Sequence, residues 1–231
     1  MRFHKTVNIV LIIIALSLNC AQAKNPRKIS GEMISVSSGY YIPLFKVGNE
    51  PTKQFIKQFY IQSHLVTNLE YLEFVKANPE WRKSKVKRIF ADGNYLRMWK
   101  GDIDLGTQVK PNEPVTDISW FAANAYCKWI GMRLPTVSEW EFAAKRNNKI
   151  FFPERINEWT MNFNETNIVA SSVCGGAGAI ANTPEDYAAF LRYSYRDNLK
   201  ANYSLDDLGF RCVSDSPEKY SQQLNVLVVK K

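Results

Sequence analysis

The chain has 231 residues, of which 45% are hydrophobic and 23% are charged, and its formal net charge is +8. This length and apolar content allow a sizeable core. The only histidines are His4 and His64, which excludes metal sites rich in histidine. Much of the positive charge lies in residues 82–88 and at Lys230-Lys231. We interpret it as a solvated basic surface rather than a nucleic-acid site, with an acidic partner protein or an anionic membrane surface as alternatives.

Residues 1–23 predict a secretory signal peptide. Arg2 and Lys5 precede a mostly apolar run over 7–18, and residues 21–23 (AQA) have the small-residue pattern of a cleavage site. The run is shorter than the roughly 20 residues that span a membrane, and no later segment is longer, so we expect no transmembrane segment. Cleavage after Ala23 predicts a periplasmic or secreted protein. Lipidation of Cys20 is the weaker alternative, because SLN before it matches the lipoprotein pattern poorly.

Residues 24–231 are expected to form one domain, since no low-complexity linker or repeat divides them. Residues 31–59 predict short strands. A helix is then expected with Thr67 or Asn68 as its cap and an end at Asn78-Pro79. Leu69, Leu72 and Val75 or Lys76 follow at helical spacing.

Two further helices are predicted from their caps. Ser119 begins one that carries Cys127 on its inward face and ends at Gly131. Thr136 and Glu139 have the spacing of a capping box and begin the other. Beyond Asn147 the sequence predicts mostly loop, with one more helix from Pro184.

The cysteines predict one disulfide and one candidate site. Loss of Cys20 with the signal peptide would leave Cys127, Cys174 and Cys212, an odd number that predicts one disulfide and one free thiol. Cys174 stands in VCGGAGAIA (173–181), where it runs into a glycine-rich turn. It is a candidate nucleophile, metal ligand or small buried residue.

Four segments together resemble one known family. VTNLEYLEFV, PVTDISWFAANAYCKWIGMRLPTVSEWEFAA, INEWT and LGFRC, in this order, resemble the formylglycine-generating enzyme family, also called the sulfatase-modifying-factor domain. The resemblance extends from Gly39 to Val213. It implies a single compact α/β (α+β) domain with much irregular structure, related to the C-type lectin fold.

The resemblance also implies roles for the cysteines. In the family, the cysteine before RLPT commonly pairs with that of GFRC, which predicts a Cys127–Cys212 disulfide and leaves Cys174 as the free thiol. Aerobic members use two cysteines just after a GGSW stretch to hold copper(I) and to oxidise a substrate cysteine with oxygen. Here residues 175–178 stand where GGSW would be, Cys174 precedes them, and residues 179–197 contain no cysteine. This departure argues against formylglycine synthesis and leaves open whether the chain is an enzyme.

A second departure concerns calcium. Where the family has GNVWEW, this chain has ERINEWT, so that Glu154-Arg155 replace Gly-Asn while Glu158 and Trp159 are kept. An arginine opposes binding of a hard cation, so we expect at least one calcium site of the family to be lost. Arg133 and Arg211 are expected to hold core loops through hydrogen bonds to carbonyl groups.

The C-terminal third carries a narrower resemblance. Residues 190–212 and the cysteine directly before GGAGA are similar to the accessory proteins encoded beside copper nitrite reductases, the NirV type. The resemblance to the formylglycine-generating enzyme family also implies that an aromatic and basic cluster could line a groove for a partner peptide, with helix packing and surface salt bridges as the alternative; the cluster is Tyr187, Arg192, Tyr193, Tyr195 and Arg196.

Two hypotheses of function follow. In the first, an exported factor modifies or matures a periplasmic protein, such as a copper or redox enzyme, with Cys174 at the working site and copper as the candidate cofactor. In the second, a non-catalytic module binds the partner and Cys174 is buried.

Overall fold

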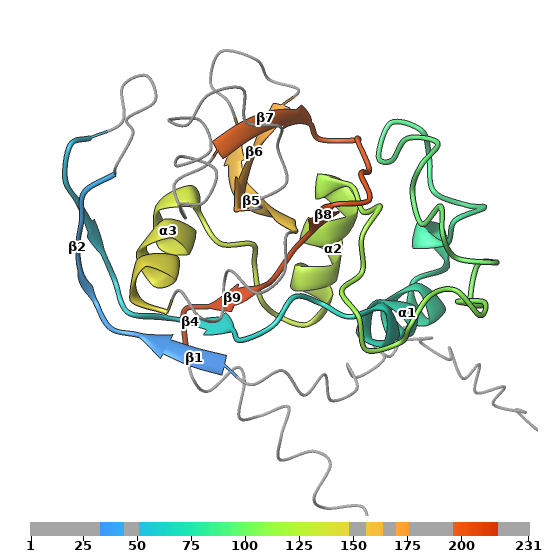
Figure 1. Ribbon diagram of the computed structural model, residues 1–231, viewed down its shortest axis with the longest axis horizontal. Coiled ribbons are helices and arrows are strands. Elements are labelled where there is room, and N and C mark those ends of the chain that lie inside the picture. The colour runs from blue at the N-terminus through green and yellow to red at the C-terminus, as the bar shows by residue number, and fades with distance from the viewer. Residues whose placement is uncertain (1–32, 44–50, 148–155, 164–169, 176–195, 217–231) are drawn as a thin grey trace, which may run out of the picture.

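The computed structural model describes residues 33–43, 51–147, 156–163, 170–175 and 196–216 (Figure 1). These residues form short strands, three α-helices of ten residues each, and one 3-10 turn. In chain order the elements are β1 (Met33–Val36), β2 (Gly39–Tyr41), β3 (Gln54–Ile56), β4 (Phe59–Gln62), α1 (Asn68–Ala77), η1 (Pro79–Trp81), α2 (Trp120–Trp129), α3 (Val137–Arg146), β5 (Asn157–Phe163), β6 (Ala170–Gly175), β7 (Arg196–Lys200), β8 (Leu208–Gly209) and β9 (Val213–Ser214).

The strands form three small sheets. One has the order β1-β4-β9, a second is the β2-β3 pair, and the third has the order β7-β6-β5-β8. Only the β5–β8 pair is parallel among these described pairings. Helices α2 and α3 contact β5, and α3 also contacts β6 and β3, so α3 packs between two of the sheets (Figure 1). The arrangement is a mixed α/β domain, and the long segment from η1 to α2 contains neither helix nor strand.

The three predicted helix starts are confirmed. The side chains of Thr67, Ser119 and Thr136 each accept a hydrogen bond from a backbone N–H in the first turn, and Thr67 and Thr136 form full capping boxes with Glu70 and Glu139. Gly131, the predicted terminator of α2, has a φ of 74°, which glycine adopts without steric cost.

One expectation was wrong. Leu69 does not share the buried face of α1 with Leu72 and is 45% exposed, because Tyr71, Leu72, Phe74 and Val75 are the residues that fill the core. The described residues after Asn147 contain the strands β5 to β9, which the sequence did not predict. β5 lacks the pattern of a core strand because it buries the polar residues Glu158 and Thr160 beside Trp159.

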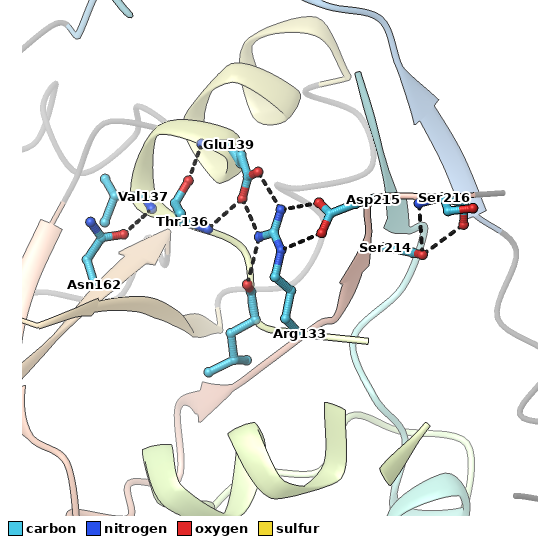
Figure 2. A network of polar contacts seen from close by, with 9 residues as sticks. Arg133, Thr136, Val137, Glu139, Asn162, Ser214, Asp215 and Ser216 are labelled. Atoms are coloured by element: carbon cyan, nitrogen blue, oxygen red, sulfur yellow. Dashed lines mark hydrogen bonds and ion pairs between the residues drawn. The ribbon is translucent and has the colours of Figure 1, made fainter. Parts of the chain in front are cut away.

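Arg133 joins the start of α3 to the chain after β9 (Figure 2). Its guanidinium donates to both carboxylate oxygens of Glu139, at 2.7 Å each, and also to Asp215. Glu139 in turn accepts from the backbone N–H of Thr136 at 2.8 Å, within the capping box. The expected carbonyl contact exists, to Leu134 at 3.2 Å, but the main partners are carboxylates because these offer a planar, charged match to the guanidinium.

Candidate functional site

The centre of the site is a buried ion pair between Glu158 of β5 and Arg211, the residue before Cys212. Glu158 and Arg211 are 1% and 2% exposed. The guanidinium donates from Nε to Oε2 at 2.6 Å and from Nη2 to Oε1 at 2.8 Å, which is a bidentate pairing. Each charge is thereby compensated in the buried interior, and the two side chains hold one another in a single orientation.

Gln62 ties this pair to β4. Its carbonyl oxygen accepts from Nη1 of Arg211 at 3.2 Å, and its side-chain oxygen accepts from the backbone N–H of Cys212 at 2.7 Å. Arg211 therefore makes one of the expected carbonyl contacts, although a carboxylate is its main partner. No local sequence signal marks Gln62 for this role, because its partners lie about 150 residues further along the chain.

The implied disulfide is present. Cys127 of α2 and Cys212 are bonded, with their Cα atoms 5.6 Å apart and 85 residues between them in sequence. Because Cys212 directly follows Arg211, the covalent bond and the buried ion pair fix the same point of the core.

Cys174 lies near the end of β6, which continues to Gly175. The rest of the predicted glycine-rich turn, from Gly176 on, lies outside the described residues. The strand register places Cys174 directly opposite Glu158 of β5 on one side and Arg196 of β7 on the other. Glu158 is in turn opposite Gly209 of β8. We call these four positions, Gly209, Glu158, Cys174 and Arg196, the Cys174 row.

Of the predicted partner cluster, the structure describes the backbone of Arg196 alone. Arg196 begins β7 and stands in register with Cys174, so two of the predicted site residues are brought together. Tyr187, Arg192, Tyr193 and Tyr195, and the helix predicted from Pro184, lie outside the described residues.

The residues present do not provide the two-thiolate copper site that the resemblance implies. Copper(I) prefers soft sulfur ligands, and Cys127 and Cys212 are already bonded to each other. Within the described part of the chain, no three His, Cys, Asp or Glu side chains converge as a metal site. The predicted loss of a calcium site stays a prediction.

A family model described as "Sulfatase-modifying factor enzyme 1-like domain" matches residues 20–161, so the chain belongs to this family. An uncharacterized protein of Borreliella burgdorferi is 27% identical over 190 residues, which cover 68% of this chain and 37% of that protein. Mouse "Inactive C-alpha-formylglycine-generating enzyme 2" is 30% identical over 142 residues, which cover 54% of this chain and 45% of that protein. The chain thus spans less than half the length of these relatives.

The fold is also similar to a solved structure. That of PvdO from Pseudomonas aeruginosa matches with a TM-score of 0.54 at 17% identity, covering 79% of this chain and 94% of that one. At this identity the similarity concerns the fold alone. No helix in the described ranges is long and apolar enough to cross a membrane.

Proposed function

We propose that this chain is an exported accessory factor that acts on a partner protein through the Cys174 row, and that it does not itself synthesise formylglycine. The observation that carries the proposal is the Cys127–Cys212 disulfide. It occupies two of the four cysteines, and a third, Cys20, lies in the predicted signal peptide. Cys174 is then the only thiol of residues 24–231. A reaction that needs two thiolates in one chain therefore lacks the second cysteine.

The strand neighbours of Cys174 support a working role for it. One neighbour in the register, Glu158, is held rigidly by Arg211, and the other, Arg196, belongs to the predicted partner cluster. A site built on strands with a fixed supporting shell is more accurately positioned than one on a free loop. A partner bound along β7 would therefore meet Cys174 in a defined place.

The class of partner follows from the resemblance in residues 190–212. We propose a periplasmic copper or redox enzyme, as for the NirV-type accessory proteins, in line with the predicted signal peptide. A copper(I) ion bound by Cys174 requires further ligands from that partner, because this chain supplies one thiol. We also propose that the fold is related to that of C-type lectins.

A second candidate function has an observation of its own. The mouse relative matched over 142 residues is described as inactive, so the family contains members without the oxidase activity. On this reading the chain is a non-catalytic module that binds a partner, and Cys174 only packs in the core.

Alkylation of the native protein separates the two candidates. With iodoacetamide under native conditions, the exported, disulfide-intact protein is expected to gain one adduct at Cys174, located by peptide mass spectrometry, because a working thiol must be reachable. Cys174→Ser is the matched control and should gain none while keeping its disulfide and circular dichroism spectrum. Modification that begins only in denaturant would overturn the first candidate and favour the second.

A further inference from the structure

A pocket of about 150 Å³ lies beside Asp117, between the start of α1 and the irregular chain that leads to α2. It belongs to a different part of the domain from the Cys174 row and does not depend on the function proposed above. The residues that line it include Asn68, Leu96, Trp99, Val109, Glu113 and Asp117.

Asp117 is a buried carboxylate without a hydrogen-bond partner in the described part of the chain. The residue is 1% exposed, and both carboxylate oxygens are buried and accept no hydrogen bond there. The cation beside it is Arg97, whose Nη2 is 3.6 Å from Oδ1, beyond hydrogen-bond distance. That guanidinium is closer to Asp206, at 3.3 Å. A buried charge that lacks hydrogen bonds is unfavourable unless a ligand or another donor supplies them.

The backbone holds this carboxylate in place at a steric cost. Asp117 has a φ of 55° and Leu96 a φ of 50°, both in the left-handed region that non-glycine residues seldom adopt. The two are joined by a hydrogen bond from the N–H of Leu96 to the carbonyl of Asp117, and the N–H of Asp117 donates to Leu205. Such conformations persist where surrounding structure enforces them and are concentrated at binding sites.

The opposite wall is preformed by Asn68. Its side-chain amide donates to the carbonyls of Lys110, Glu113 and Pro114 at 3.0–3.2 Å, and its oxygen accepts from the indole N–H of Trp99 at 3.0 Å. These contacts use the hydrogen-bonding capacity of Asn68 and fix the Trp99 ring. Of the other lining residues, Leu96, Met98, Trp99 and Val109 offer apolar surface, while Gln108 and Thr116 add polar groups.

The lining of the pocket contains two carboxylates, Glu113 and Asp117, and no Lys, Arg or His. Glu113 is already paired with Lys110 at 2.6 Å, so Asp117 is the carboxylate that a ligand can serve. The volume of the pocket is well below the roughly 300–1,000 Å³ of pockets for whole drug-sized ligands. A single charged group on a short apolar stem matches both the size and the charge.

We propose that this pocket binds an organic cation that carries N–H donors, the alkylammonium or guanidinium end of a partner protein's side chain. The cation supplies the hydrogen bonds that the Asp117 carboxylate lacks, and its aliphatic stem lies along Trp99 and Val109. The flexible Met98 at the rim, which is half exposed, moves aside to admit it, because the Asp117 oxygens are shielded from water.

Two small cations test the proposal directly. Butylammonium and ethylguanidinium are titrated into the full exported protein while the indole N–H signal of Trp99, assigned with Trp99→Phe, is followed by NMR. We expect a saturable shift, absent with 1-butanol and with tetramethylammonium, and the tighter of the two cations identifies a lysine-like or arginine-like group. Asp117→Asn should weaken binding at least tenfold. No saturable shift, or equal affinity in Asp117→Asn, would overturn the proposal.

Stability measurements on Asp117→Asn show whether weaker binding comes only from a loss of folding. Burial raises the pKa of Asp117, Arg97 and Lys83 oppose this rise, and the nearby Asp206 and Asp92 add to it. A carboxyl whose pKa is higher in the folded state destabilises the fold as the pH rises through that pKa. Asparagine tolerates the left-handed backbone and removes the charge, so the variant is expected to be at least as stable at pH 7 and less sensitive to pH above 4. A clearly less stable variant would mean that the carboxylate is structural, satisfied by ordered water.

Discussion

Replacing Glu158 by glutamine is expected to lower the free energy of unfolding by about 3–5 kcal/mol. The substitution keeps the size of the side chain but removes its charge, and the buried Arg211 guanidinium then loses the bidentate carboxylate that compensates it. The carbonyl of Gln62, which accepts from Arg211 at 3.2 Å, is a poorer partner than a bidentate carboxylate. The loss should appear as a lower urea midpoint with an unchanged slope.

An exposed ion pair provides the matched control. Glu73 and Lys76 on α1 are 2.8 Å apart and both side chains are partly exposed, so Glu73→Gln should cost less than about 1 kcal/mol. Replacing both Glu158 and Arg211 by methionine should recover much of the loss, because no unpaired charge stays buried. Equal costs for Glu158→Gln and Glu73→Gln would contradict the account of the site as a desolvated, mutually fixed pair.

Removing the disulfide with Cys127→Ala and Cys212→Ala together is expected to cost about 4 kcal/mol. The bond closes a loop of 85 residues, so its loss gives the unfolded chain much more conformational freedom. Both cysteines are fully buried, and the double alanine variant avoids leaving reactive thiols in the core. The free energy of unfolding in urea measures the effect.

Reduction of the wild-type protein should reproduce this loss, because it breaks the same bond without changing the sequence. Cys174→Ser should change the free energy of unfolding by much less. A double alanine variant as stable as the wild type would show that the bond does not constrain the fold, and the argument that it fixes the Arg211 region would fail.

The helices were predictable because their signals are local. Thr67, Ser119 and Thr136 each form the predicted cap, and Gly131 has the positive φ expected of a terminator. A cap needs only residues within the first turn, so the sequence contains the whole signal. The exposed position of Leu69 was missed because larger aromatic side chains of α1 took the buried face.

The sheet and the site could not be predicted in the same way, because they depend on partners far apart in sequence. The pairing of Glu158 with Arg211 joins residues 53 positions apart, and Gln62 meets Cys212 across 150. No local pattern marks such pairs. The disulfide partners were expected only from the family resemblance, since three cysteines allow three pairings, and nothing in PVTDISW marked Asp117 as a buried unpaired carboxylate.

We propose that this chain keeps the family's fold without the two-thiol chemistry of formylglycine synthesis. The most direct test incubates the disulfide-intact protein with copper(I), oxygen and a peptide that carries a sulfatase cysteine motif, and follows the peptide by mass spectrometry. We predict that the cysteine is not converted to formylglycine, while an active formylglycine-generating enzyme assayed in parallel converts it. Conversion by this chain that is lost in Cys174→Ser would contradict the claim, because a single thiol would then suffice.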